Sequence, residues 1–219
     1  MQYSMTSNVR IIDSDNDNIT DRIYIGDTGG QIWRVDLATL LTATSRPEST
    51  TVVGKLAEIS TPTDNNKKRR FFDTPSVIQV NDTEFSDENN YDYVLIGSGY
   101  RAHPLNTTVH DRFYAFRDFF GSKQMGDKDG DNVSEANDAY PQPSGTAFRD
   151  SNLVDLTTTI LDSSEPSHKG AGGWFYDFTA QGAIGEKVLS SPVTANFTTL
   201  FTTFTPESST SASNPCGAS

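Results

Sequence analysis

Four aspartates stand at spaced positions in a short stretch that runs directly into a predicted β-strand. The stretch is Asp13-Ser14-Asp15-Asn16-Asp17-Asn18-Ile19-Thr20-Asp21, and the strand begins at Arg22. Alternate residues of a tight loop can point to one centre, and Ca²⁺ binds about six to eight oxygen ligands. Acids this close repel one another unless a cation lies between them. The spacing therefore predicts a calcium site whose ligands are Asp13, Asp15, Asp17, the carbonyl of Ile19, and Asp21.

The stretch differs from a complete EF-hand loop. Position 12 is Tyr24 rather than glutamate, and no helical period flanks the stretch. Position 6, which usually requires a positive φ and is usually glycine, is Asn18, a residue that tolerates this conformation. The sequence thus predicts a nine-residue loop between β elements. The alternative is a solvated acidic turn that binds no specific ion.

A second acidic stretch extends from Asp127 to Asp138. Its candidate ligands are Asp127, Asp129, Asp131, Glu135 and Asp138. Glycine stands at position 4 instead of 6, and Lys128 interrupts the acids. The stretch lies within residues 120–151, which have little periodicity and are predicted to be a long inserted loop. A solvated loop is the favoured interpretation here, and a second calcium site is the alternative.

Alternating β-branched and aromatic residues predict an all-β chain, because no useful period of 3.6 residues is present. Gly29-Gly30 between two alternating segments indicates a hairpin in which Ile23, Ile25, Ile32 and Trp33 would be buried. A short helix is expected within Ser151–Leu161. The predicted strands are Arg22–Asp27, Gln31–Asp36, Thr51–Ala57, Pro75–Val80, Tyr91–Gly97, Asp111–Arg117, Gly173–Phe178, Glu186–Ser191 and Thr199–Phe204.

An Asp-Arg-hydrophobic-Tyr unit occurs twice, at Asp21–Tyr24 and at Asp111–Tyr114. Weak recurrence of a hairpin-rich unit is typical of propeller blades. The predicted fold is therefore a β-propeller, with residues 1–219 forming one domain. A two-sheet sandwich is the alternative.

Other motifs favour structural roles over chemistry. Gly97-Ser98-Gly99-Tyr100-Arg101-Ala102 fits the dinucleotide pattern, but no helix follows that could receive a pyrophosphate, so the glycines indicate a tight strand exit. The basic run Lys67–Arg70 is interpreted as a solvated turn, since a net charge of −12 disfavours nucleic acid as a partner. No nucleophile elbow or zinc spacing occurs, which favours a non-enzymatic protein.

The single cysteine, Cys216, cannot form an internal disulfide, and no apolar stretch approaches the length of a transmembrane span. No signal peptide is visible at the N-terminus. The chain is therefore expected to be cytosolic or an excised piece of a longer exported protein.

Several segments together resemble the C-terminal domain of the PilC/PilY family, the type IV pilus tip and biogenesis proteins of Gram-negative bacteria. The segments, in chain order, are the acidic loop with Asp21–Leu37, Arg70-Phe71-Phe72 with Pro75, Leu95–Leu105 leading to Asp111–Ala115, Gly173-Trp174-Phe175 with Gly185–Val188, and Phe201–Pro206. They span nearly the whole chain. The Gly99–Pro104 segment is the most specific of them.

The resemblance implies a β-propeller with a calcium loop between blade strands, formed here by Asp13, Asp15, Asp17, the Ile19 carbonyl and Asp21. Because the chain looks shorter than the family domain, the propeller is expected to be partial or a fragment of a longer exported protein. It also implies an exported protein at the cell surface, fimbrium or outer membrane, where calcium modulates pilus extension, retraction, twitching motility and adhesion. The implied partners are the minor pilins of the type IV pilus and a host-cell surface. Asn18 departs from the family pattern, which often has glycine there.

Two further classes remain open. An adhesion propeller like the integrin α repeats also has a D-x-D-x-D-x-x-x-D loop before a strand, but the Gly97–Leu105 segment argues against it. A quinoprotein dehydrogenase fragment is suggested by the Gly29–Trp33 hairpin. Bound quinone in the purified protein would separate that enzyme from the two binding proteins.

Overall fold

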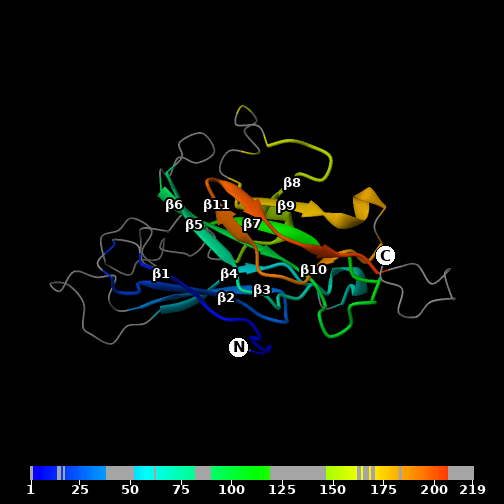
Figure 1. Cartoon of the computed structure of the whole chain (residues 1–219), viewed down its shortest axis with the longest axis horizontal. Coiled ribbons are helices and arrows are strands. Elements are labelled where there is room, and N and C mark those ends of the chain that lie inside the picture. The colour runs from blue at the N-terminus through cyan, green and yellow to red at the C-terminus, as the bar shows by residue number, and fades with distance from the viewer. Residues whose placement is uncertain are drawn as a thin grey trace.

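Strands arranged in stacked sheets dominate the computed structural model of the chain. It describes residues 2–13, 16, 18–37, 52–61, 63–81, 90–118, 147–161, 164, 168, 171–182 and 184–206. The N-terminal sheet is an antiparallel meander in sequence order, made of β1 (Arg10–Ile12), β2 (Arg22–Gly26), β3 (Gln31–Asp36) and β4 (Val52–Glu58). It forms the lower layer in Figure 1.

The central sheet lies above the N-terminal sheet (Figure 1) and repeats the antiparallel meander. Its strands are β5 (Ser76–Asn81), β6 (Asn90–Gly97), β7 (Arg112–Asp118) and β9 (Gly173–Asp177). The two-residue strand β8 (Val154–Asp155) adds to the edge of β9 in parallel. Two successive meanders of four antiparallel strands correspond to the blade-like units that the sequence predicted.

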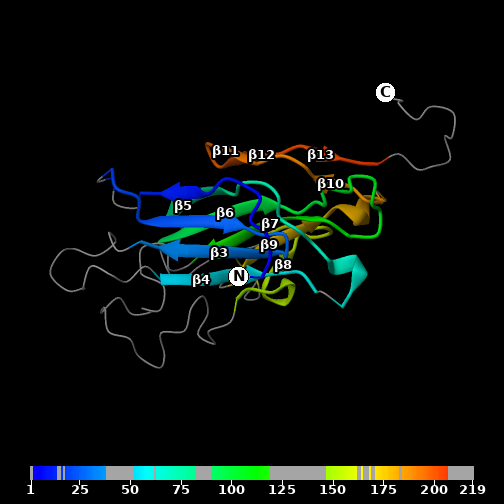
Figure 2. The same ribbon diagram turned by 90° about the horizontal axis from the view of Figure 1, so that it is seen from below.

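Two small antiparallel pairs follow in the C-terminal part. The strand β10 (Lys187–Val188) pairs with β13 (Thr203–Phe204), and β11 (Val193–Ala195) pairs with β12 (Thr198–Leu200). β11 lies beside β5, where Ser76 Oγ and Thr194 Oγ1 are 3.0 Å apart. Figure 2 shows β11, β12 and β13 along one side of the stacked sheets. Three short 3₁₀ turns, Asn65–Lys67, Asp150–Asn152 and Phe178–Gln181, complete the described elements.

The main core lies between the two large sheets. Side chains two residues apart on one strand point to the same face, so Val94 with Ile96 and Tyr114 with Phe116 project from the central sheet toward Ile32 of the N-terminal sheet. The remaining members of this buried cluster are Tyr24, Leu56, Ala57, Ile59, Phe71, Val77, Phe148 and Phe175. Since both sheets contribute, neither can bury its apolar face without the other.

The opposite face of the central sheet carries a second, smaller core. Leu95, Phe113 and Ala115 pack there with Phe178 and with Val188 of β10. Phe201 stacks on Phe113 with the ring centroids 4.1 Å apart. The C-terminal strands thus cover a face that the alternation of β6 and β7 leaves apolar.

The turn between β2 and β3 is organised by Asp27. Its buried carboxylate accepts hydrogen bonds from the backbone N–H of Gly29 and Gln31 and from the indole N–H of Trp33, at 2.9, 3.0 and 2.9 Å. Gly30 has φ +71°, and a Cβ there would lie 2.6 Å from Cβ of Ser60. The Gly29-Gly30 hairpin prediction is confirmed, and its second glycine is required both by conformation and by space.

The all-β prediction is confirmed, and the strand from Gln31 to Asp36 has the predicted bounds. Of the short helix expected within Ser151–Leu161, the structure has only a 3₁₀ turn at Asp150–Asn152, and β8 follows it. The strands β1 and β11 were not predicted. The described strands do not close into a ring of blades.

Residues 119–146 lie outside the described part of the chain, and the last residues of the predicted insertion are packed. Phe148 belongs to the main core, and its backbone N–H donates to Leu56 O at 2.8 Å. In the described ranges, no helix has the length and apolar character needed to span a bilayer.

Candidate metal centre

The acidic loop joins β1 to β2, two neighbouring antiparallel strands. Ile12 faces Arg22 in the register, and the N–H of Asp21 donates to Ile12 O at 2.8 Å. Asp13 and Asp21 therefore occupy the next pair of facing positions, where Cβ atoms are typically about 4.5–5.5 Å apart. The antiparallel pairing thus brings together the first and last of the predicted calcium ligands.

The chain folds back on the carboxylate of Asp13. Its two oxygens accept hydrogen bonds from the backbone N–H of Asn16 and of Asn18, at 2.7 and 2.9 Å. Both asparagines have positive φ, 63° and 69°. The expectation that Asn18 takes the conformation usually left to glycine is confirmed. Two left-handed asparagines let a short loop curl around its first acid.

The other end of the loop is buried. Asp21 is 2 % exposed, and its carbonyl accepts from the N–H of Leu37 at 2.7 Å. Ile19, whose carbonyl was predicted as a ligand, has a side chain that is 48 % exposed. Asp15 and Asp17 lie outside the described residues. The loop therefore has a fixed beginning and end.

The structure leaves both calcium predictions open. Among the described residues, no group of three or more potential metal-ligating side chains gathers. Two of the four acids of the first loop are not among these residues, and neither are Asp127, Asp129, Asp131, Glu135 and Asp138 of the second. Carboxylate and carbonyl oxygens in a loop closed by facing strands nonetheless suit a hard cation such as Ca²⁺.

A buried charge network lies directly behind the loop, at the residue that follows Asp21. Arg22 pairs with Asp92 of β6, and both side chains are almost fully buried. Arg34 of β3 pairs with Asp36 at 2.6 Å and with Asp118 of β7 at 2.8 Å. These contacts join the two sheets at the end where β2 and β6 begin. We call these five residues and Tyr24 the inter-sheet network.

Burial raises the pKa values of two members of this network, Asp92 and Tyr24. The hydroxyl of Tyr24 lies 2.8 Å from a carboxylate oxygen of Asp92 and 2.6 Å from one of Asp118, although it carries only one proton. Asp92 and Asp118 therefore compete for this one phenol proton. Burial raises the pKa of Asp92 to about 6, against the opposing effect of Arg22. Burial also raises the pKa of Tyr24, so the phenol stays neutral.

The sequence did not predict buried arginines. Ile23 and Trp33, predicted to be buried, are only half-buried, while Arg22, Tyr24 and Arg34 face the central sheet. The signal that could have identified them is the Asp-Arg-x-Tyr unit, since arginine and tyrosine two residues apart share one face of a strand. An apolar residue between two polar ones was interpreted as the inward position.

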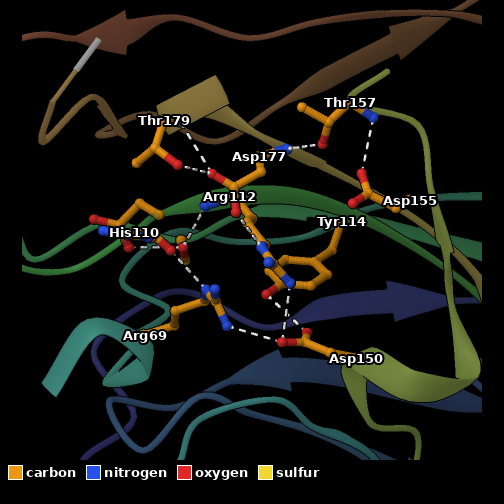
Figure 3. A network of polar contacts seen from close by, with 11 residues as sticks. Arg69, His110, Arg112, Tyr114, Asp150, Asp155, Thr157, Asp177 and Thr179 are labelled. Atoms are coloured by element: carbon orange, nitrogen blue, oxygen red, sulfur yellow. Dashed lines mark hydrogen bonds and ion pairs between the residues drawn. The ribbon is translucent and has the colours of Figure 1, made fainter. Parts of the chain in front are cut away.

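The second Asp-Arg-x-Tyr unit forms an equivalent cluster centred on Asp150 (Figure 3). Both Arg69 and Arg112 lie 2.9 Å from Oδ2 of Asp150, and the hydroxyl of Tyr114 lies 3.2 Å from Oδ1. Arg69, interpreted from the sequence as part of a solvated turn, is only 1 % exposed and also donates to His110 O. The basic run is therefore partly structural.

The Nε of Arg112 donates to Asp177 at 2.7 Å and extends this cluster to β9. Burial raises the pKa of Asp177, but hydrogen bonds from Thr179 and Arg112 outweigh it, and the resulting pKa lies below the ordinary value. The Asp177 N–H donates to Thr157 Oγ1, and Asp155 accepts from the Thr157 N–H (Figure 3). Both Asp-Arg-x-Tyr units thus anchor a strand through ion pairs, which are fully buried in the first unit and partly buried in the second.

The Gly97-Ser98-Gly99 segment is a tight strand exit, as predicted, and no helix follows it. A Cβ on Gly97 would lie 2.3 Å from the side chain of Val188, and a Cβ on Gly99 would lie 2.2 Å from Val188 O. Between them, Ser98 exchanges hydrogen bonds with the backbone of Arg112 and Val188. The glycines allow β10 to pack against the end of β6.

Asp111 is buried beside this strand exit. Its Oδ1 accepts from Ser98 Oγ at 2.7 Å, whereas its Oδ2 is buried with no partner among the described residues. Lys187, also buried, donates to the carbonyls of Pro104, Asn106 and Gly185. Burial raises the pKa of Asp111 from 3.8 to about 6, although Ser98 and Lys187 act in the opposite direction.

Because the pKa of Asp111 is raised, the stability of the folded protein should depend on pH in a defined direction. Between pH 4 and 6 the folded protein keeps a proton on Asp111 that the unfolded chain has lost, so stability falls as pH rises through this range. A change of pKa from 3.8 to about 6 corresponds to roughly 3 kcal/mol. We expect Asp111→Asn to gain stability relative to wild type by up to this amount between pH 4 and 7, measured by urea unfolding. A constant difference across this range would contradict the assignment.

Comparison with known proteins agrees with this architecture. No protein-family model matches the chain, and a search of curated proteins gives no match either. Among solved structures, the crystal structure of the Pseudomonas aeruginosa PilY1 C-terminal domain is similar, with a TM-score of 0.54 and 16% sequence identity. The alignment covers 91% of this chain and 44% of that one, so the chain spans less than half the length of its structural relative. Over nearly its whole length, the chain has a fold like that of the PilY1 C-terminal domain.

Proposed function

We propose that the chain is a non-enzymatic, calcium-binding β-propeller segment of a type IV pilus biogenesis or tip protein. The observation that carries the proposal is an acidic loop with four spaced aspartates on a fold like that of the PilY1 C-terminal domain. The segment belongs, in this proposal, to an exported protein of a Gram-negative bacterium, located at the cell surface or fimbrium. Its partners are the minor pilins and a host-cell surface.

Calcium binding would make the acidic loop more ordered. Binding would neutralise the mutual repulsion of Asp13, Asp15, Asp17 and Asp21 and fix the start of β2. The next residue, Arg22, belongs to the inter-sheet network, so a change in the loop reaches buried groups within one residue. A ligand shifts an equilibrium by its differential affinity for two states, and an ordered loop edge would favour one partner contact over another. The proposed output is a change in pilus extension, retraction or adhesion.

The calcium site is tested by calorimetry with calcium and with magnesium. We expect clear preference for calcium, because Mg²⁺ requires near-ideal octahedral geometry. Asp17→Ala should abolish the tight site, because it removes one of four acidic ligands. Glu186→Gln is the control, since it removes one negative charge from a half-buried position outside both acidic loops. Equal binding of both metals, or unchanged binding in Asp17→Ala, would contradict the site.

The pilus role is tested in the native bacterium with the full-length protein. Asp17→Ala should alter surface piliation or twitching motility while expression stays normal, and Asp17→Lys, whose ammonium imitates the bound charge, should push the phenotype the opposite way. Normal piliation and motility of both variants across calcium levels would leave the loop with a structural role only. Bound quinone in the purified protein would contradict the non-enzymatic proposal and favour a quinoprotein.

A further inference from the structure

A small basic pocket opens at the end of the N-terminal sheet opposite the acidic loop. Its volume is about 230 Å³, and it is lined by Tyr3, Thr28, Gly29, Ser60, Lys68, Arg69 and Arg70. We call it the Lys68 pocket. Its lining contains three cationic residues, three hydroxyl-bearing residues and no acid, in a chain whose net charge is −12. The pocket is therefore locally positive, although the net charge of the chain is negative.

The walls of the pocket are held by backbone hydrogen bonds from four segments. The N–H of Thr28 donates to Ser4 O at 2.9 Å, and the N–H of Ile59 donates to Gly30 O at 3.0 Å. A Cβ on Gly29 would lie 2.0 Å from the ring of Tyr3, so this ring lies directly on the β2–β3 turn. The pocket is thus formed in advance of any ligand, which lowers the cost of binding.

The nearby acids are already engaged. Asp27 directs its carboxylate to Gly29, Gln31 and Trp33, and Asp64 pairs with Lys67 at 3.3 Å. Arg69 already donates hydrogen bonds to Asp150 and to His110 O. Among the described residues, no acid lies within ion-pair distance of Lys68. Its ammonium is therefore a charge of the pocket that no acid among the described residues neutralises.

Arg70 supplies a second, better-fixed cation. Its guanidinium lies 3.9 Å from the ring of Tyr100, and its Nη1 donates to Lys68 O at 3.0 Å. A guanidinium has five N–H donors, so this one hydrogen bond leaves others for a ligand. The stacking holds the planar group in place, and a fixed planar fork suits the oxygens of a tetrahedral or planar anion.

We propose that the Lys68 pocket binds a phosphate or sulfate group. Lys68 and Arg70 would supply the charge, and the hydroxyls of Thr28, Ser60 and Tyr3 would donate to the remaining oxygens. A volume of about 230 Å³ is below the 300–1,000 Å³ or so of pockets for drug-sized ligands, so the site accommodates one small group. Neither calcium nor the acidic loop takes part in this binding.

The test is an amide-resolved NMR titration of the whole chain in calcium-free buffer at constant ionic strength. The probes are inorganic phosphate, inorganic sulfate and methyl phosphate. We expect saturable shifts at Thr28, Gly29 and Ser60. Tighter binding of inorganic phosphate would identify a free ion as the ligand, whereas equal or tighter binding of methyl phosphate would identify an ester group of a larger molecule.

Two matched lysine variants decide whether the pocket is specific. Lys68→Gln should weaken phosphate binding about tenfold, since it removes a charged hydrogen bond, while Lys67→Gln should leave it within about twofold. Thr28→Val should weaken binding without changing net charge. Absence of saturable shifts in the wild type, or equal weakening in both lysine variants, would overturn the proposal, because the second result indicates general electrostatic attraction.

Discussion

Arg34→Ala is expected to lose about 4 kcal/mol of unfolding free energy, because it removes a buried cation that pairs with two buried carboxylates. The guanidinium of Arg34 is fully buried and pairs with both Asp36 and Asp118. Removing one partner of a buried pair is more damaging than replacing the whole pair, since the remaining charge stays desolvated. Urea unfolding, followed by tryptophan fluorescence, measures the loss.

Lys55→Ala is the matched control. Lys55 pairs with Glu58 at 3.1 Å, but about a third of its side chain is exposed. Exposed pairs contribute roughly 0–1 kcal/mol, so this variant should unfold close to the wild-type midpoint. Similar losses for both variants would mean that the inter-sheet network adds no more than a surface ion pair does.

Phe116→Ala should destabilise the protein by about 3–5 kcal/mol, the usual result of removing a buried aromatic side chain. Phe116 is fully buried in the main core, and its ring stacks on Tyr114 with centroids 5.4 Å apart. Because this core belongs to both sheets, the loss should appear as a shift of one cooperative transition. Two separated transitions in the variant would show that the sheets unfold independently.

Phe197→Ala provides the comparison at the surface. Phe197 is 86 % exposed at the turn between β11 and β12. Surface substitutions away from special features usually change stability by about 0.5 kcal/mol or less. A cost comparable to that of Phe116→Ala would contradict this expectation, which rests on the 86 % exposure of Phe197.

Elements with strong local signals could be predicted from the sequence. Gln31–Asp36 alternates, follows a Gly-Gly turn and has the predicted bounds. β1 and β11 could not be found, because three residues give too few positions to establish a period. β8 forms only because Val154 pairs with Trp174, some twenty residues away, and local propensity carries no information about that pairing.

Only the part of the candidate metal centre that depends on neighbouring residues could be predicted from the sequence. The spacing of Asp13 to Asp21 can be read locally, and so can the left-handed asparagine at position 18. Asp92 and Asp118, which pair with Arg22 and Arg34 across the sheets, come instead from β6 and β7, more than 65 residues further along the chain. Hydrophobicity assigns an arginine to the surface unless its distant carboxylate is known. The Lys68 pocket is likewise assembled from four separate segments.

The position of β1 at the edge of the N-terminal sheet has a mechanical consequence. Its three residue pairs with β2 run from Arg10–Tyr24 to Ile12–Arg22, and the acidic loop closes this ladder. A force applied to the chain before Arg10 would break the hydrogen bonds of these pairs one after another. It would not load all of them at once in shear. Asp13 and Asp21 stand at the closed end, where peeling would stop or continue into β2. A cation bound between these two aspartates would resist the separation of β1 from β2 at this end.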